Sequence, residues 1–170
     1  MKSCGYGCTL GSVRDRSQFA HYHYMSWFED RITERESVRE HCRVIDANAI
    51  PVYEAVWRQI MEVVEEAGAS GIILCPGGSS EERYLTLARE RLDYRLNSTE
   101  RTISAAFGEQ SVVLGLDVCD GGVVCLMHDG KRINERVAAR LILDPFIFPE
   151  LPPFVCEEES VYERRGMRSL

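Results

Sequence analysis

Residues 71–82 have the clearest potential for chemistry, because an apolar run leads into glycines, serines and glutamates. The apolar run predicts a short buried strand, and Ser79 with Glu82 has the capping-box spacing that opens a helix. Such a turn aims backbone N–H groups and the positive end of a helix dipole at one point, where an anion can bind. The candidate ligand-binding residues are Gly77, Gly78, Ser79, Ser80 and Arg83, and a tight capped turn that binds no ligand is the other interpretation.

The same stretch lacks the intact signatures of phosphate and nucleotide chemistry. No lysine follows the glycines as it does in the phosphate-binding loop, and the dinucleotide pattern G-x-G-x-x-G is absent. Cys75 could be the nucleophile of a C-x5-R phosphatase loop, but Glu81 stands where that motif requires arginine. No catalytic motif is intact, so the sequence leaves enzymatic activity open and favours non-enzymatic binding.

The run Pro76-Gly77-Gly78, followed by Glu81 and Glu82, resembles the PGG-x-G-T-x-x-E loop of the cytokinin-activating phosphoribohydrolases, the lysine-decarboxylase-like family. In that family the loop and its glutamate contact the sugar phosphate of a nucleotide. The G-T pair of the family loop is missing here, and the glutamates come earlier. The resemblance implies a nucleotide-like ligand at this turn.

Four residues near the N-terminus are candidate zinc ligands: Cys4, Cys8, His21 and His23. C-x3-C is a usable spacing for zinc, and H-x-H would place two imidazoles on one face of a strand. No second C-x-x-C or H-x3–5-H pair completes a known site, so packing or solvent exposure without metal is the other interpretation. A metal-binding protein is therefore an alternative function, and the sequence identifies no cofactor.

Residues 145–155 are apolar but interrupted by prolines, which predicts an extended segment outside any central strand. The segment either closes the core or forms a patch that another protein, or a second copy of the chain, covers. An accessory or regulatory protein that acts by protein–protein interaction or self-association through this segment is the first alternative function.

Composition limits the class of partner and the compartment. The formal net charge of −7 argues against non-specific nucleic-acid binding, which needs clustered basic residues. No apolar run approaches the roughly 20 residues of a membrane span, and the N-terminus lacks a secretory apolar region. The seven cysteines include no C-x-x-C, so we expect reduced thiols in a soluble, intracellular and cytoplasmic protein.

Periodicity and capping signals predict helices at four places. Ser26 with Glu29 forms a capping box, Asn48 with Pro51 suits a helix start, and Asn134 suits another. The expected helices cover residues 26–42, 48–67, 79–96 and 134–144.

Strand signals are fewer. We expect a strand at 71–75 and a hairpin at 111–128 that turns at Asp120-Gly121-Gly122, while 101–107 is ambiguous. The predicted fold is a single layered α+β or α/β domain over residues 1–170, with a small mixed sheet packed by three to four helices. Residues 1–20 are expected as a loop-like arm and 156–170 as a charged tail.

Overall fold

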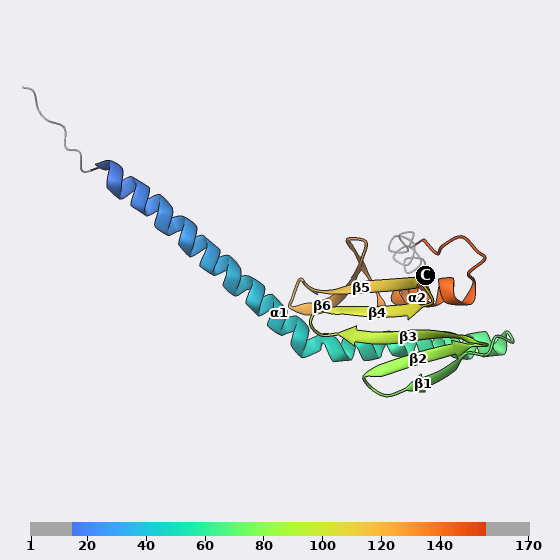
Figure 1. Ribbon diagram of the computed structural model, residues 1–170. Coiled ribbons are helices and arrows are strands. Elements are labelled where there is room, and N and C mark those ends of the chain that lie inside the picture. Colours follow the sequence, from blue (N-terminus) through green and yellow to red (C-terminus); the bar gives the residue numbers. More distant parts are fainter. Residues whose placement is uncertain (1–14, 156–170) are drawn as a thin grey trace, which may run out of the picture. The chain divides into compact units, whose positions relative to one another are not determined.

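The computed structural model describes the backbone of residues 15–155 and the side chains of residues 26–155. Within them the chain forms a long helix, a seven-stranded sheet and a second helix (Figure 1). The predicted fold is therefore wrong, because the described residues have two helices and every strand pair is antiparallel. Neither of these helices has a stretch long and apolar enough to cross a membrane.

The chain divides by its internal contacts into two units, Met1–Glu40 and His41–Leu170. Helix α1, Asp15–Ala69, contributes residues to both units. It begins inside the segment 1–20 that was expected as a loop-like arm, while residues 1–14 and the tail 156–170 lie outside the described residues. The single domain over residues 1–170 stays a prediction.

Helix α1 is one helix where the sequence predicts two. Asn48, the expected N-cap, instead donates from its side-chain Nδ2 to the carbonyl of Val44, and Pro51 lies inside the helix. An interior proline costs about 3 kcal/mol, but each large apolar side chain that becomes buried contributes about 1.5–3 kcal/mol. The buried positions of α1 lie on both sides of the proline, so burial outweighs the lost hydrogen bond. They are Ile45, Ala49, Tyr53, Val56 and Ile60.

The sheet is a meander in which each strand pairs with the next strand of the chain. All of its connections join antiparallel neighbours, so the sheet contains no crossover. The strands are β1 Cys75–Gly78, β2 Glu82–Leu87, β3 Glu90–Asn97, β4 Thr102–Phe107, β5 Gln110–Cys119, β6 Val123–His128 and β7 Lys131–Ile133.

The helix expected at 79–96 is wrong, because these residues form the β2–β3 hairpin. Leu85 pairs with Leu92 in the register, and both side chains are fully buried. Leucines spaced for one face of a helix can also lie on one face of two paired strands, if the chain reverses between them. The reversal at Ala88 and Arg89 carries no glycine, proline or asparagine, although Ala88 has a φ of +54°. The usual turn signal is therefore missing from the sequence.

Both edges of the sheet are protected against pairing with another strand. Ser79 N–H donates to the Glu82 carbonyl at 2.9 Å, which closes the β1–β2 turn. Counting back along the antiparallel register places Pro76 at a position whose nitrogen faces the outer edge, where it has no hydrogen to donate. The opposite edge, β7, has three residues, two of them basic. Short, charged or proline-containing edges disfavour edge-to-edge association.

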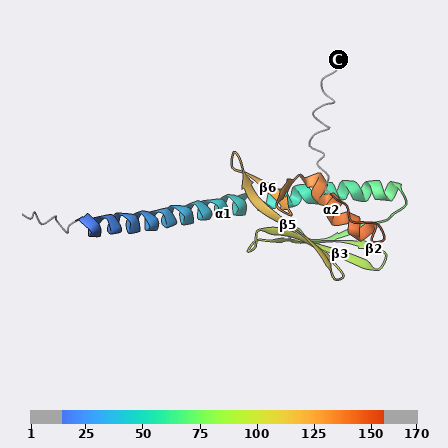
Figure 2. The same cartoon turned by 90° about the horizontal axis from the view of Figure 1, so that it is seen from above.

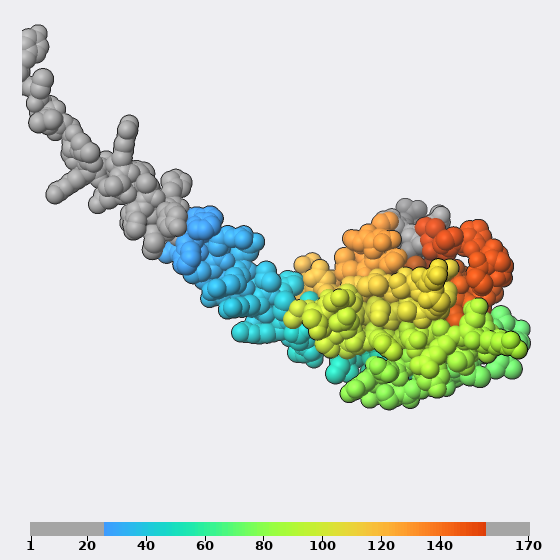
Figure 3. Space-filling view, in the orientation of Figure 1, coloured from blue at the N-terminus to red at the C-terminus, as the bar shows by residue number. Residues whose placement is uncertain are grey.

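Residues 41–69 of α1 and the second helix pack against the same face of the sheet and share one hydrophobic core (Figure 2). The other face is not covered by either helix, and Figure 3 shows the side chains of the strands across it. Helix α2, Glu135–Ile147, begins as predicted, with Asn134 accepting from the Val137 N–H at 2.8 Å. Pro145 does not end α2, because it lies inside the helix next to buried Phe146.

A disulfide joins Cys119 and Cys125 across the β5–β6 hairpin. The expectation of reduced thiols is therefore wrong for these two residues. Among the described residues, Cys42 and Cys75 are free thiols. The predicted turn at Asp120-Gly121-Gly122 is present and lies inside the loop that the disulfide closes.

Candidate functional site

The expected anion-binding turn is the tip of the β1–β2 hairpin. Residues 79–81 connect two antiparallel strands, and no helix follows them. The helix dipole and the free first-turn N–H groups that would attract an anion are therefore not formed there. The Ser79 hydroxyl oxygen lies 3.4 Å from the amide nitrogens of Glu81 and Glu82, so it faces the turn's own backbone.

The two glycines of this turn have structural explanations. A Cβ atom on Gly77 would lie 2.4 Å from the Tyr84 ring, so the side chain of Tyr84 packs directly on the Gly77 backbone. Gly78 has a φ of +100°, and a Cβ atom there would lie 2.1 Å from the Glu82 carbonyl oxygen. Only glycine fits such a conformation without strain. Ser80 is exposed, and ligand binding at Gly77–Ser80 stays a prediction.

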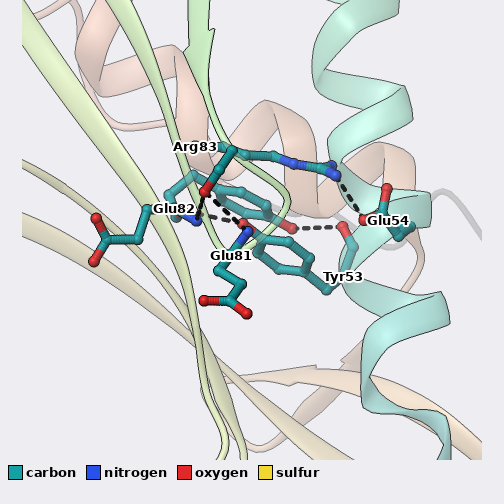
Figure 4. Close-up of polar contacts among 7 residues, drawn as sticks. Tyr53, Glu54, Glu81, Glu82 and Arg83 are labelled. Atoms are coloured by element: carbon teal, nitrogen blue, oxygen red, sulfur yellow. Dashed lines mark hydrogen bonds and ion pairs between the residues drawn. The ribbon is translucent and has the colours of Figure 1, made fainter.

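Arg83, which was expected to neutralise a bound anion, points from β2 to α1 and is paired with an acidic residue of the helix (Figure 4). Its Nη2 lies 2.6 Å from the Glu54 carboxylate, and the Arg83 side chain is only 13% exposed. Its guanidinium carbon lies 5.2 Å from the Tyr53 ring centroid and 5.3 Å from that of Trp57. Nη1 is buried and has no hydrogen-bond partner among the described residues, so the aromatic faces supply its favourable contact.

Beneath Arg83, two tyrosines join α1 to β3 through reciprocal hydrogen bonds. Each phenol donates to the other residue's backbone carbonyl, Tyr94 to Tyr53 at 2.9 Å and Tyr53 to Tyr94 at 3.2 Å. Their rings stack with centroids 4.6 Å apart. Burial raises the pKa of both phenols above the ordinary value of 10.0, because the ionised form would lose its solvation.

This group, Tyr53, Glu54, Arg83 and Tyr94, is a structural anchor between helix and sheet. Its one cation is neutralised by Glu54, and its phenols are held in the neutral form, so it offers no acid, base or nucleophile poised for reaction at neutral pH. The sequence does not predict Tyr53, Glu54 and Tyr94 as partners of Arg83. No local signal in the sequence indicates this pairing, because Arg83 directly follows Glu81 and Glu82 and precedes Tyr84.

The zinc candidates are not brought together in the described part of the chain. Cys4 and Cys8 lie outside that part. His21 and His23 belong to helix α1, whereas the sequence predicts a strand for them. Among the residues whose side chains are described, no group of three His, Cys, Asp or Glu side chains could hold a metal ion. A metal site at the N-terminus stays a prediction.

The expected extended segment 145–155 is divided by the structure. Its first residues belong to α2 and close the core through Phe146, which is 1% exposed. The Phe154 N–H donates to the Asp144 carboxylate at 3.2 Å, so the rest of the segment returns to α2. Leu151 and Val155 are exposed. Self-association through this segment stays a prediction.

A different surface appears in α1 before residue 41. Between residues 26 and 40 no side chain is buried, although the helix carries large apolar residues there. Trp27 is 55% exposed, Phe28 is 52% exposed and Val38 is 57% exposed. Arg31 and Glu34 lie between them and form an exposed ion pair within the helix. Exposed aromatic and aliphatic side chains on a helix are typical of a surface that binds another helix.

Comparison of the chain with known protein families, with curated proteins and with solved structures found no match.

Proposed function

We propose that this chain is a non-enzymatic assembly protein that self-associates through residues 26–40 of α1. The observation that carries the proposal is the α1 seam, defined as Trp27, Arg31, Glu34 and Val38. Its two apolar ends are each more than half exposed, and a charged pair lies between them. Successive seam residues are four, three and four positions apart, which is the spacing of core positions in paired helices.

The seam lies along one face of the helix. Trp27 and Val38 are eleven positions apart, which corresponds to three turns plus about 20° at about 100° per residue. Arg31 and Glu34 fall within the same sector. A second helix laid against this face would therefore contact all four side chains.

The order of the seam residues is complementary to itself when two copies run antiparallel. Trp27 of one copy then lies opposite Val38 of the other, and Arg31 lies opposite Glu34, so each contact occurs twice about the two-fold axis. A parallel pair in register would place Arg31 against Arg31 and Glu34 against Glu34. Like charges that face each other across an interface are destabilising. The charge order thus favours the antiparallel pair.

Magnitudes indicate a weak dimer. Covering roughly 300 Å² of apolar surface at about 25 cal/mol per Å² contributes about 7 kcal/mol. Association itself costs about 4–15 kcal/mol in lost translational and rotational freedom. The lowest of these costs leaves about 3 kcal/mol of net association free energy, so we expect association that depends on protein concentration in the millimolar range. The protected edges of the sheet support the helix, rather than the sheet, as the surface for assembly.

Charge reversal tests the proposal by sedimentation velocity over a range of protein concentrations. Arg31→Glu alone, or Glu34→Arg alone, places like charges in the two central contacts and should give a monomer. The double variant Arg31→Glu/Glu34→Arg restores opposite charges and should dimerise again.

Glu36→Arg is the matched control, because it makes the same charge change two positions away on the opposite side of the helix. It should dimerise as the wild type does. A wild-type chain that stays monomeric at the highest concentration, or a double variant that fails to recover while circular dichroism shows an intact helix, contradicts the proposal. Capture of a different protein by a strictly monomeric chain would also contradict it.

A further inference from the structure

We propose that the Cys119–Cys125 disulfide is a reversible thiol–disulfide exchange site whose attacked sulfur is that of Cys119. The proposal is independent of the α1 seam, because it concerns the β5–β6 hairpin in the unit His41–Leu170. Its ligand class is a small dithiol reductant.

The position of the disulfide argues against a purely structural role. The two cysteines are six positions apart, and five register pairs of the β5–β6 ladder, from Gly115↔Met127 to Cys119↔Val123, already hold the same strands together. A cross-link stabilises mainly by removing freedom from the unfolded chain, and it removes least when the closed loop is short. This cross-link therefore restrains a hairpin that its hydrogen bonds already define.

The two cysteines differ in exposure. Cys125 is 6% exposed, whereas Cys119 is partly exposed at the end of β5. The exposed turn residues Asp120, Gly121 and Gly122 follow directly, and both glycines have positive φ angles. A thiolate therefore has more open access to Cys119, beside the exposed turn, than to the buried residue Cys125. Attack on the more accessible sulfur determines which cysteine leaves.

The exchange has two steps. A thiolate of the dithiol attacks Sγ of Cys119, the S–S bond breaks, and Cys125 leaves as a thiolate that takes up a proton. The second thiol of the reagent then attacks its own sulfur in the mixed disulfide and releases Cys119 as a thiol. The protein gains two electrons and two protons, and the dithiol is oxidised to its cyclic disulfide.

Local charge predicts which reductant reacts faster. Asp120 follows Cys119 in the chain, and Asp117 is the register partner of Cys125; both carboxylates are exposed. These anionic groups repel the thiolate of glutathione, which carries carboxylates as well, more strongly than the thiolate of a dithiol without carboxylates. The site therefore selects dithiols that carry no carboxylate.

The test is reduction of the folded full chain by dithiothreitol without denaturant, followed by alkylation and peptide mass spectrometry. We expect both cysteines to become alkylated within minutes and the disulfide to re-form on oxidation, with glutathione at least tenfold slower at equal thiolate concentration. Hydrogen exchange should rise over residues 117–125 on reduction and stay unchanged in β2–β4.

Single variants test the assignment of the attacked sulfur. The free thiol of Cys119 in Cys125→Ser should react with an aromatic disulfide at least tenfold faster than Cys125 in Cys119→Ser, each followed on its own peptide. Cys75→Ser, which removes an exposed free thiol elsewhere, should leave reduction of the disulfide unchanged. A disulfide that resists dithiothreitol until the chain unfolds, or equal reactivity of the two thiols, overturns the proposal.

Discussion

Tyr94 donates a hydrogen bond from its phenol to the backbone carbonyl of Tyr53 at 2.9 Å, and Tyr53 returns one to the carbonyl of Tyr94 at 3.2 Å. The two residues lie in β3 and α1 and are 41 positions apart. Each phenol therefore adds a hydrogen bond between helix and sheet to those that the two carbonyls have within their own elements. The pair therefore fixes the helix against the sheet both by packing and by hydrogen bonding.

Replacing Tyr94 by phenylalanine should lower the free energy of unfolding by about 1 kcal/mol, because the buried hydrogen bond from the phenol to the Tyr53 carbonyl is lost. Urea denaturation monitored by circular dichroism measures the change. Tyr84→Phe is the control, because Tyr84 lies on the opposite face of the sheet, and its free energy of unfolding should change by less. Equal losses in the two variants would contradict a specific role for the Tyr94 hydroxyl.

Stability should fall as the pH rises above about 10, the pKa of tyrosine in an unfolded chain. Burial raises the pKa of Tyr94 in the folded protein, so above pH 10 the unfolded chain loses a proton that the folded chain keeps. The unfolded state then binds fewer protons, and the free energy of unfolding decreases with pH. Urea denaturation at pH 8 to 11 should show a shallower decline in Tyr94→Phe, where Tyr53 alone contributes. Identical slopes would argue against a buried phenol at position 94.

Removing the partner of Arg83 should cost more than removing the whole pair. Glu54→Ala leaves the buried guanidinium with its ring contacts only, and we expect a loss of about 2 kcal/mol. Adding Arg83→Met to Glu54→Ala should recover most of that loss, because an apolar side chain of similar length needs no counter-charge. A double-mutant cycle in urea gives the coupling free energy.

The control for this cycle is the exposed ion pair of Arg95 and Glu82, in which Arg95 Nη2 lies 3.8 Å from Glu82 Oε1. Glu82→Ala should change the free energy of unfolding by less than about 0.5 kcal/mol, as is usual for solvated ion pairs. A larger loss for Glu82→Ala than for Glu54→Ala would show that burial does not govern these pairs.

Two turn substitutions should act in opposite directions. Gly78→Ala introduces a side chain at a φ of +100° against the Glu82 carbonyl and should destabilise the protein by more than about 1 kcal/mol. Ala88→Gly relieves a left-handed alanine at a φ of +54° and should stabilise it by about 0.5–1 kcal/mol. Thermal unfolding of both variants measures the signs, and equal signs would contradict the turn geometry.

The parts of the fold that the sequence predicts correctly are those with strong local signals. Asp120-Gly121-Gly122 turns a hairpin, and Asn134 caps α2, because turn glycines and capping side chains act on their immediate neighbours. The strand at 71–75 is displaced, since β1 begins only at Cys75. Local signals therefore predict that these elements exist, but they do not predict where each element begins and ends.

The errors arise where local signals compete with tertiary burial. Leucines from Leu85 to Leu96 suit a helix and a hairpin equally, and the glycine-free reversal at Ala88 hides the choice. Pro51 predicts a helix start, but burial of the stripe on both sides of it keeps α1 continuous. Pairing of Cys119 with Cys125, and of Arg83 with Glu54, depends on which strands and helices become neighbours, and no local pattern reveals that.

The meander has a consequence for how the chain is made. Each strand pairs with the strand that follows it in the chain after a short turn, so the sheet can form one hairpin at a time during synthesis. The apolar stripe of α1 is made first, and Tyr53 precedes its partner Tyr94 by 41 residues. At about 5–20 residues per second, that stripe is without its sheet for about 2–8 s on the ribosome. A nascent chain that ends before β3 is therefore the form of this protein most in need of a chaperone.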